Sequence, residues 1–262
     1  MTGWEEILKK ALVTSGLDTK GWMEIETALR NRAFFSAEVM QMRIVHDFRT
    51  NVAEIMKNAK SNSEVRRDIR EILASIGYDS GENRGTIKDL MTKARLDVMI
   101  RTNIQQARGY ANHLKATSAG AIMAFPAYEF VRVQQRKVPR NWGSRWTKAA
   151  NTVGWEGVAK DTSRMIALKY SPIWKELSVF GNPFPPFDFN SGMGVRDVSK
   201  SVCREIGLLG PGEQPKIPEK PDFNGNLEAA VNFDDNSPEW AHLKKVFGDQ
   251  IVYKDGKVKW AA

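Results

Sequence analysis

Hydrophobic residues in the first 120 positions recur every three or four residues, the spacing of helices that bury one face. The pattern predicts helices over residues 7–12, 18–29, 36–59, 61–77 and 86–116. Ser61 and Glu64 have the spacing of a capping box, and Gly77 is a typical helix stop. The first half of the chain therefore predicts a helical bundle.

The pattern changes after Gly120, where helical spacing gives way to short elements and turns. Residues 128–133 (YEFVRV) are aromatic and β-branched and predict a strand. Residues 181–198 hold three prolines and three glycines, which favours an irregular segment over a long helix or a central strand. The remaining predicted pieces are a short strand or helix end at 165–168 and short helices at 172–179 and 199–206.

The last part of the chain is predicted to be an extended arm. Residues 210–236 are rich in Pro, Gly, Asn and acidic residues, which is typical of a segment that lies on a partner or is disordered alone. Residues 238–247 predict a helix, and Asp255–Gly256 predicts the turn of a hairpin. The expected fold class is α+β: an N-terminal helical bundle with long helices, a small mixed α/β, loop-rich domain and an extended C-terminal arm. The corresponding domains are residues 1–120, 121–209 and 210–262.

Charge adds a preference for acidic partners. The net charge is +8, and residues 1–210 hold 32 Lys and Arg against 22 Asp and Glu, whereas the remaining residues hold 7 against 9. A basic body favours polyanions or an acidic protein surface. A solvated basic surface that keeps the protein soluble is the alternative interpretation, and it stays open.

Composition also bears on the compartment. The N-terminus lacks the layout of a signal peptide, and no apolar run reaches the roughly 18 residues of a membrane span. Cys203 is the single cysteine, which excludes an internal disulfide and a Cys-rich zinc site. We expect a soluble protein made in a reducing cytosol.

Two groups of basic residues are the candidate contacts for a polyanion. One is the polar face of the second long helix: Lys88, Arg95, Arg101 and Arg108. The other lies in the segment RKVPRNWGSRW: Arg136, Lys137, Arg140 and Arg145. Trp142 and Trp146 in the same segment could stack on nucleotides, but a place in the core is the favoured interpretation.

No pattern predicts catalysis, a metal or a cofactor. The three histidines, His46, His113 and His242, stand apart and lack paired-ligand spacing. Cys203 has no motif that would activate it as a nucleophile. The two glycines of Gly192–Met193–Gly194 are a fragment of a phosphate-binding loop pattern, but they follow a Pro-rich coil instead of a strand. Nucleotide binding is therefore not expected. Asp188, Asp197 and Asp161 could supply carboxylates for acid–base chemistry, but nothing brings two together, and a turn or cap role is favoured for the first two.

Three segments in a fixed order carry a resemblance. Residues 18–39 place a Trp-containing helix before an Ala/Arg/Phe-rich stretch, and residues 63–78 (SEVRRDIREILASIGY) precede a helix with the step Arg101–Thr102–Asn103. A Pro-Pro turn then follows at residues 183–192. Together, over about residues 17–208, they resemble the phage Mu F-like minor head proteins. The motif residues with an implied structural role are Arg101, Thr102, Asn103, Pro185, Pro186, Phe187 and Gly192.

One departure limits what the resemblance implies. Many relatives carry a Cys or His cluster around the Pro-Pro turn, whereas this chain has Met193, Val195 and Asp197 there. A metal-dependent role is therefore not carried over. We expect prolines and aromatic residues to hold this turn together.

The resemblance implies a structural head morphogenesis protein that is made in the host cytoplasm and ends in the virion. Its implied partners are the portal and/or major capsid protein and double-stranded DNA bound without sequence specificity. No small-molecule substrate, cofactor or membrane is expected. The alternatives are an enzyme of the nuclease or ADP-ribosyl-transfer type, with residues 211–262 as an appended domain, and a scaffolding factor absent from the finished particle.

Overall fold

The computed structural model has the α+β fold that the sequence predicts. It describes residues 3–8, 11–13, 25, 33–35, 42–75, 77–86, 88–155, 164–220, 228–230 and 233–260. The chain forms two compact units: unit 1 consists of Met1–Ala107 and Asp222–Ala262, and unit 2 of Arg108–Pro221. The predicted boundary at residue 120 and the predicted arm from residue 210 differ from this division.

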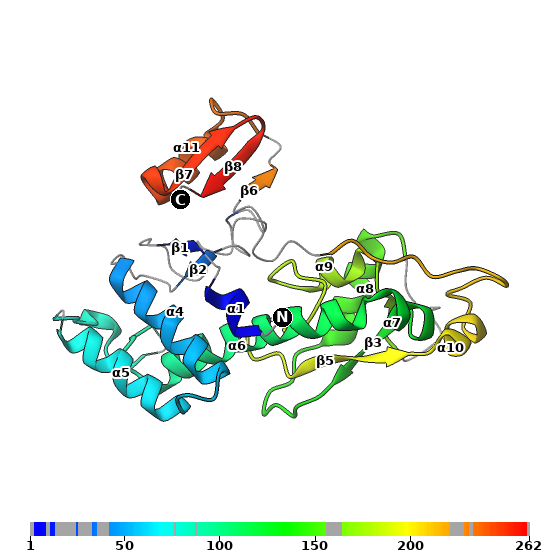
Figure 1. The fold of residues 1–262 in the computed structure, drawn as a ribbon, viewed down its shortest axis with the longest axis horizontal. Helices are drawn as coiled ribbons and strands as arrows, with labels where there is room; N and C mark the ends of the chain where they lie inside the picture. The colour runs from blue at the N-terminus through cyan, green and yellow to red at the C-terminus, as the bar shows by residue number, and fades with distance from the viewer. Residues whose placement is uncertain are drawn as a thin grey trace. The chain divides into compact units, whose positions relative to one another are not determined.

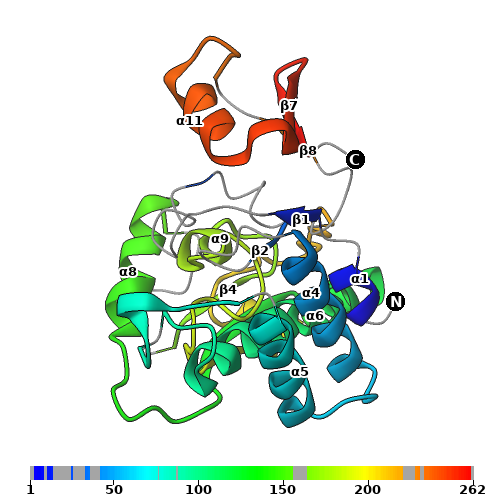
Figure 2. The same cartoon turned by 90° about the vertical axis from the view of Figure 1, so that its left-hand side faces the viewer.

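Helices make the hydrophobic core of unit 1. In Figures 1 and 2, α4 and α5 lie side by side. The helices are α1 (Gly3–Leu8), α4 (Met42–Met56), α5 (Asn62–Ser75) and the first part of α6 (Lys93–Ala116). Their buried side chains include Ile7, Phe48, Val52, Val65, Ile69, Leu73, Leu96 and Ile100. The amphipathic pattern of the sequence therefore predicted α4 and α5 correctly.

Both predicted end signals of α5 are confirmed. The Ser61 backbone N–H donates to Glu64 Oε2 at 2.7 Å, and the Glu64 N–H donates to Ser61 Oγ at 3.3 Å, which closes the capping box. At the other end Gly77 has φ +68°, and the Tyr78 N–H donates to the Leu73 carbonyl at 2.9 Å. This left-handed residue satisfies carbonyls that the helix end leaves open.

The start of α6 was predicted too early. The Asp89 carboxylate accepts the backbone N–H groups of Gly85 and Met91, both at 2.8 Å, and this folds the chain into turns. Thr92 then caps the helix, because its Oγ1 accepts the Arg95 N–H at 3.2 Å. The helix therefore begins at Lys93 instead of near residue 86.

The N-terminal part differs from the prediction at residues 7–12. The predicted helix over residues 7–12 stops at Leu8, and strand β1 (Ala11–Val13) pairs in parallel with β2 (Ala33–Phe35). The predicted helix at 18–29 lies outside the described residues except for Ile25, which is buried.

A three-stranded antiparallel sheet organises unit 2. Strand β3 (Ala127–Arg132) lies between β4 (Ile166–Leu168) and β5 (Met193–Val198). Short helices surround it: α7 (Ala119–Ala124), α8 (Trp142–Thr152), α9 (Ile173–Leu177) and α10 (Lys200–Glu205). Strand β5 lies in the segment predicted to be irregular, so that prediction is wrong for residues 193–198. The strand begins after the last proline of the segment, and it lies at the edge of the sheet, so only one of its sides pairs with another described strand.

Aromatic side chains fill the core on one face of this sheet. Trp174 and Phe187 are fully buried, and Phe130 meets Phe187 edge-on with ring centroids 5.2 Å apart. Trp142 and Trp146 are 3% and 5% exposed and also pack on Phe130. The core interpretation of these two tryptophans is confirmed, and stacking on nucleotides is excluded for the observed conformation.

The second half of α6 belongs to unit 2 because it packs against the Pro-Pro turn. Gly109 lies against the Pro185 carbonyl, and Tyr110 contacts the Phe184 ring at a centroid distance of 5.8 Å. A side chain at position 109 would overlap that carbonyl oxygen. These contacts explain why the unit boundary falls within α6 rather than after it.

The C-terminal part contains a helix and a sheet. Helix α11 (Pro238–Phe247) is confirmed at the predicted residues, with Ser237 as its N-cap. Strands β7 (Ile251–Lys254) and β8 (Lys257–Trp260) form the predicted hairpin, and β6 (Glu228–Ala230) pairs with β8. Asp255 and Gly256 have φ values of +53° and +70°, as the two-residue turn requires.

Candidate nucleic-acid interface

The positive charge is divided unequally between the two units. Unit 2 contains 17 Lys and Arg against 9 Asp and Glu, whereas unit 1 contains 22 of each. The whole net charge of +8 therefore resides in residues 108–221. The sequence analysis placed the basic side on the helical first half of the chain. The division into units instead places the surplus of positive charge in unit 2.

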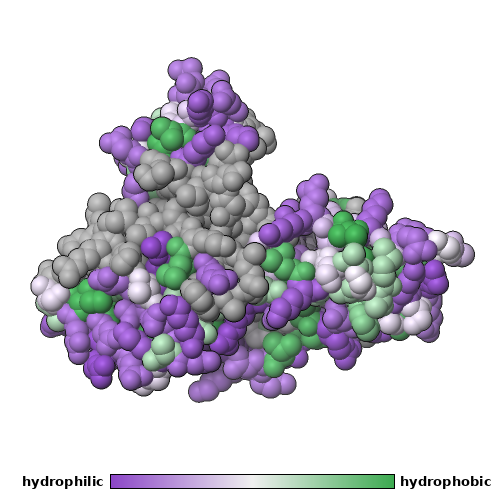
Figure 3. All heavy atoms as spheres, viewed as in Figure 1, coloured by the Kyte–Doolittle hydropathy of each residue, from purple (hydrophilic) through white to green (hydrophobic). Residues whose placement is uncertain are grey.

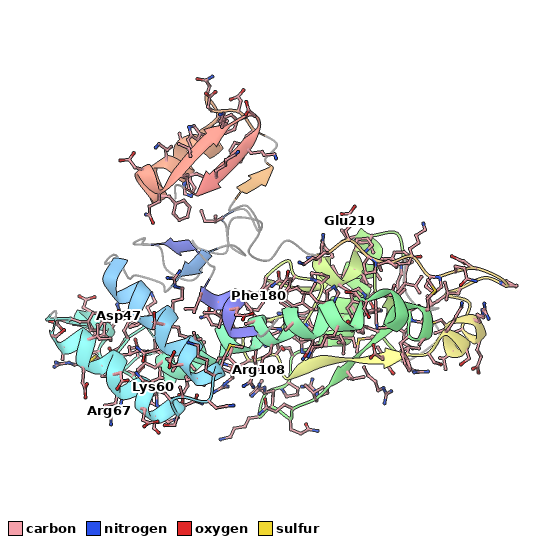
Figure 4. The ribbon with its side chains drawn as sticks, viewed as in Figure 1. Asp47, Lys60, Arg67, Arg108, Phe180 and Glu219 are labelled. Atoms are coloured by element: carbon pink, nitrogen blue, oxygen red, sulfur yellow. The ribbon has the colours of Figure 1, made fainter. Side chains whose placement is uncertain are left out.

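Several basic side chains of unit 1 form ion pairs. Lys60 lies 2.8 Å from Asp68, and Arg66 lies 2.6 Å from Asp97, which also pairs with Lys93. Figure 4 labels Lys60 and, on α5, Arg67, which contacts Asp68 and Glu71. A phosphate would have to compete with carboxylates at these positions.

The four basic residues predicted to share one helix face do not do so. Lys88 is exposed in the turn before α6, and Arg95 is half-buried. Arg101 and Arg108 are exposed on α6, but Arg101 belongs to unit 1 and Arg108, labelled in Figure 4, to unit 2. Only Arg108 is part of the unit that carries the surplus charge.

A continuous basic stretch lies in unit 2 between Glu129 and Glu156. Residues 130–155 contain six basic side chains and no acidic one: Arg132, Arg136, Lys137, Arg140, Arg145 and Lys148. The loop from β3 to α8, residues 133–141, occupies the middle of this stretch. Among the described residues on the face shown in Figure 3, hydrophilic ones predominate, with hydrophobic residues between them.

Two of the predicted contact residues are partly engaged within the fold. Arg145 Nη1 lies 2.7 Å from Asp188 Oδ2, and its guanidinium stacks over the Trp142 ring at 4.7 Å. Arg140 donates to the Phe189 carbonyl at 2.9 Å and lies 3.6 Å from the same carboxylate. Asp188 therefore ties α8 and the loop before it to the Pro-rich turn, a role beyond that of the turn residue the sequence favoured.

Arg136 and Lys137 are placed differently. Arg136 lies over Gly192, and its Nε is buried without a hydrogen-bond partner in the described structure. Lys137 is exposed. Neither side chain has a carboxylate within ion-pair distance among the described residues.

The motif residues near the Pro-Pro turn are structural in the observed fold. Pro186 and Phe187 are buried, and the Pro185–Pro186 bond is cis. Gly192 has φ +67°, and a Cβ there would lie 2.5 Å from the Gln134 carbonyl oxygen. Only glycine fits this position, because both the backbone angle and the space exclude a side chain.

The motif step on α6 is placed within the helix. Thr102 and Asn103 are half-buried, and the Asn103 amide donates to the Met99 carbonyl at 3.0 Å. Arg101 is exposed beside them.

A buried polar cluster in unit 2 escaped the sequence-based search. Lys169 is 1% exposed, and its Nζ lies 2.9 Å from the Ala116 carbonyl and 2.7 Å from Asp197 Oδ1. It also lies over the Tyr128 ring, whose hydroxyl is 3.4 Å from His113 Nδ1. No motif predicts this cluster, because its residues come from separate elements and a single lysine in the turn after β4 carries no spacing signal.

The environment of the cluster sets its protonation. Burial, with a smaller effect of Lys169, lowers the pKa of His113 to about 4, so this histidine is neutral at pH 7. Burial raises the pKa of the Tyr128 hydroxyl and raises that of the Cys203 thiol to about 11. A fully buried thiol held in its neutral form is not an activated nucleophile.

A second charged cluster was missed on β3. Glu129 is buried, and Arg164 binds it through both carboxylate oxygens at 2.9 and 3.0 Å, while Arg196 approaches at 2.5 Å. The Arg164 hydrogen bonds, followed by those of Arg196, outweigh burial and lower the pKa of Glu129 to about 2.

Within the described ranges, no three His, Cys, Asp or Glu residues form a group able to hold a metal ion. In the part of the chain that the structure describes, no helix is both long and apolar enough to cross a membrane. No family model, curated protein or solved structure matches the chain.

Proposed function

We propose that the chain is a structural head-assembly protein of a tailed bacteriophage, which binds double-stranded DNA through unit 2 and docks on the portal or capsid. The ordered segments that resemble minor head proteins support the assembly role. The observation that carries the DNA role is the charge division, because unit 2 holds the full surplus of +8. Such a surplus gains free energy when phosphates release their counterions.

Salt dependence tests the DNA role. Purified full-length protein should retain random-sequence duplex DNA at about 50 mM salt. With six or more phosphate contacts, affinity should fall at least about 1000-fold by about 200 mM. Duplexes of different sequence should bind equally. Absence of DNA retention at the lower salt concentration would exclude this part of the proposal.

Co-purification tests the assembly role. A tagged copy of the chain, co-expressed with the portal protein of the same phage, should bring that protein down in moderate salt, and the major capsid protein is the second candidate. Mass spectrometry should detect the chain in purified virions. If it occurs in procapsids and is missing from virions, the protein is a scaffolding factor instead.

We expect a structural protein of this kind to have no enzymatic activity. Assays for nuclease and ADP-ribosyl-transfer activity with the full chain should stay at background. Measurable turnover in either assay that is lost after removal of residues 211–262 would favour an appended enzyme over a structural protein.

A further inference from the structure

The loop from β3 to α8 projects beyond the sheet of unit 2 (Figures 1 and 2). It spans residues 133–141, and all its residues except Arg136 are exposed. Val133 is 66% exposed and Val138 is 86% exposed, the latter next to an exposed proline. The loop thus presents apolar side chains within the most basic stretch of the unit.

The base of this loop is held in place from both sides. The N–H groups of Val133 and Gln134 donate to the Gly192 carbonyl, both at 3.0 Å. On the other side, Arg140 binds the Phe189 carbonyl, and Asn141 Oδ1 caps α8 by accepting the Ser144 N–H at 3.0 Å. A loop fixed at its base loses less conformational entropy when its tip binds a partner.

The charges of the loop lack internal partners toward its tip. Arg140 shares Asp188 with Arg145, whereas no carboxylate of the described structure pairs with Arg136 or Lys137. Phosphate oxygens would supply acceptors for the exposed Lys137 ammonium and for the part of the half-buried Arg136 side chain that reaches solvent.

We infer that this loop is the element of unit 2 that contacts the DNA duplex, with Arg136 and Lys137 on backbone phosphates and Val138–Pro139 against the minor groove. The inference rests on the proposed function. Minor-groove proteins combine basic side chains with apolar wedges, and proline is among the residues they use. An acidic protein surface would offer the same kind of acceptor, so the choice of DNA rests on the proposed function and on the exposed Val138–Pro139 pair beside the cations.

The test compares DNA binding by full-length variants over a salt series. In Arg136→Gln/Lys137→Gln, the slope of log affinity against log salt should become shallower by about 1.8, since each phosphate contact contributes about 0.9. Val138→Ser should weaken binding several-fold and leave the slope unchanged. Circular dichroism should show the wild-type fold, because Lys137 and Val138 are exposed and Gln keeps a polar side chain at the half-buried position 136. Lys137→Gln alone, which leaves the half-buried residue unchanged, should make the slope shallower by about 0.9.

The matched control removes two charges elsewhere in unit 2. Lys175→Gln/Arg204→Gln alters exposed residues of α9 and α10 and should leave the slope close to that of the wild type. If this control loses the slope and the loop variant keeps it, the loop inference is overturned while DNA binding by unit 2 stands.

Two other outcomes would also overturn the inference. A loop variant that binds DNA normally but no longer co-purifies with the portal protein would make the loop a protein contact. If the wild-type chain itself binds no DNA at low salt, the DNA role of the proposed function fails, and the loop inference fails with it.

Discussion

Gly109 shows how much one residue contributes to the join between α6 and the Pro-Pro turn. A glycine inside a helix ordinarily costs about 1 kcal/mol relative to alanine. At this position, however, a Cβ would overlap the Pro185 carbonyl oxygen, so the close approach of helix and turn requires glycine. Gly120 in α7 is the natural contrast, because nothing lies within 4 Å of its Cβ position.

The pair predicts opposite effects on stability. Gly109→Ala should lower the free energy of unfolding by about 1–3 kcal/mol, because the turn must move away from the helix. Gly120→Ala should raise it by about 0.5–1 kcal/mol through helix propensity. Urea unfolding of both variants checks this, and a stabilised Gly109→Ala would show that the turn yields without cost.

His113 predicts a pH dependence of stability. Its pKa is about 4 in the fold and about 6.5 when unfolded, so the unfolded chain binds more protons between these values. Stability from this residue is therefore present above pH 6.5 and is lost as the pH falls toward 4, by up to about 3 kcal/mol.

Unfolding measured from pH 7.5 to 4 should show this loss, and His113→Gln should remove that portion of the slope whatever its effect at pH 7.5. A variant whose stability follows the wild-type pH curve would mean that His113 titrates normally in the folded protein.

Helix ends are the element-scale feature on which sequence and structure agree best. Ser61 caps α5 through its Oγ, as the spacing to Glu64 predicts. Ser118 precedes α7 in the same N-cap position, but its side chain makes no capping hydrogen bond. A comparison of the two serines therefore distinguishes the effect of the capping hydrogen bond from the effect of having a serine at the N-cap.

Replacement by alanine should expose this difference. Ser61→Ala should cost about 1 kcal/mol of unfolding free energy, because a backbone N–H loses its acceptor. Ser118→Ala should change stability by less than about 0.5 kcal/mol. Thermal unfolding of the two variants under one condition decides; equal losses would contradict the assigned cap geometry.

Local signals explain which elements the sequence could predict. The capping box of α5, the turn at Asp255–Gly256 and the apolar period of α4 act between close neighbours, and each is confirmed. The predicted start of α6 was wrong because the Asp89 carboxylate accepts backbone N–H groups on both sides of it. The spacing of hydrophobic residues carries no information about such hydrogen bonds. The sequence did not predict strand β5, because this strand forms by pairing with β3, whose residues are far away in the chain.

The same distinction applies to the candidate interface. The sequence found the basic segment around Arg136 and the buried role of Trp142 and Trp146, because composition alone marks them. It did not reveal that Asp188 engages Arg140 and Arg145, since that contact spans 43 residues between Arg145 and Asp188. The sequence also could not show that the net positive charge lies in one unit, because the division into units comes from the three-dimensional fold.

At the scale of the molecule, the charge division predicts that DNA acts as a stabilising ligand. Random-sequence duplex DNA at about 100 times its Kd should raise the free energy of unfolding of the bound part by about 2.7 kcal/mol at low salt. Calorimetry should show a raised unfolding temperature that disappears when salt abolishes binding. A rise that persists in high salt would point to contacts other than phosphate pairing.

The unequal charge of the two units also bears on how fast and in which orientation the molecule meets its target. A neutral part joined to a part with charge +8 has a strong asymmetry in the field of a polyanion, and that field turns the charged part forward before contact. Encounters would therefore begin with unit 2, and their rate would fall as salt screens the field. Unit 1 contributes no net attraction to this approach, because its 22 basic residues are balanced by 22 acidic ones.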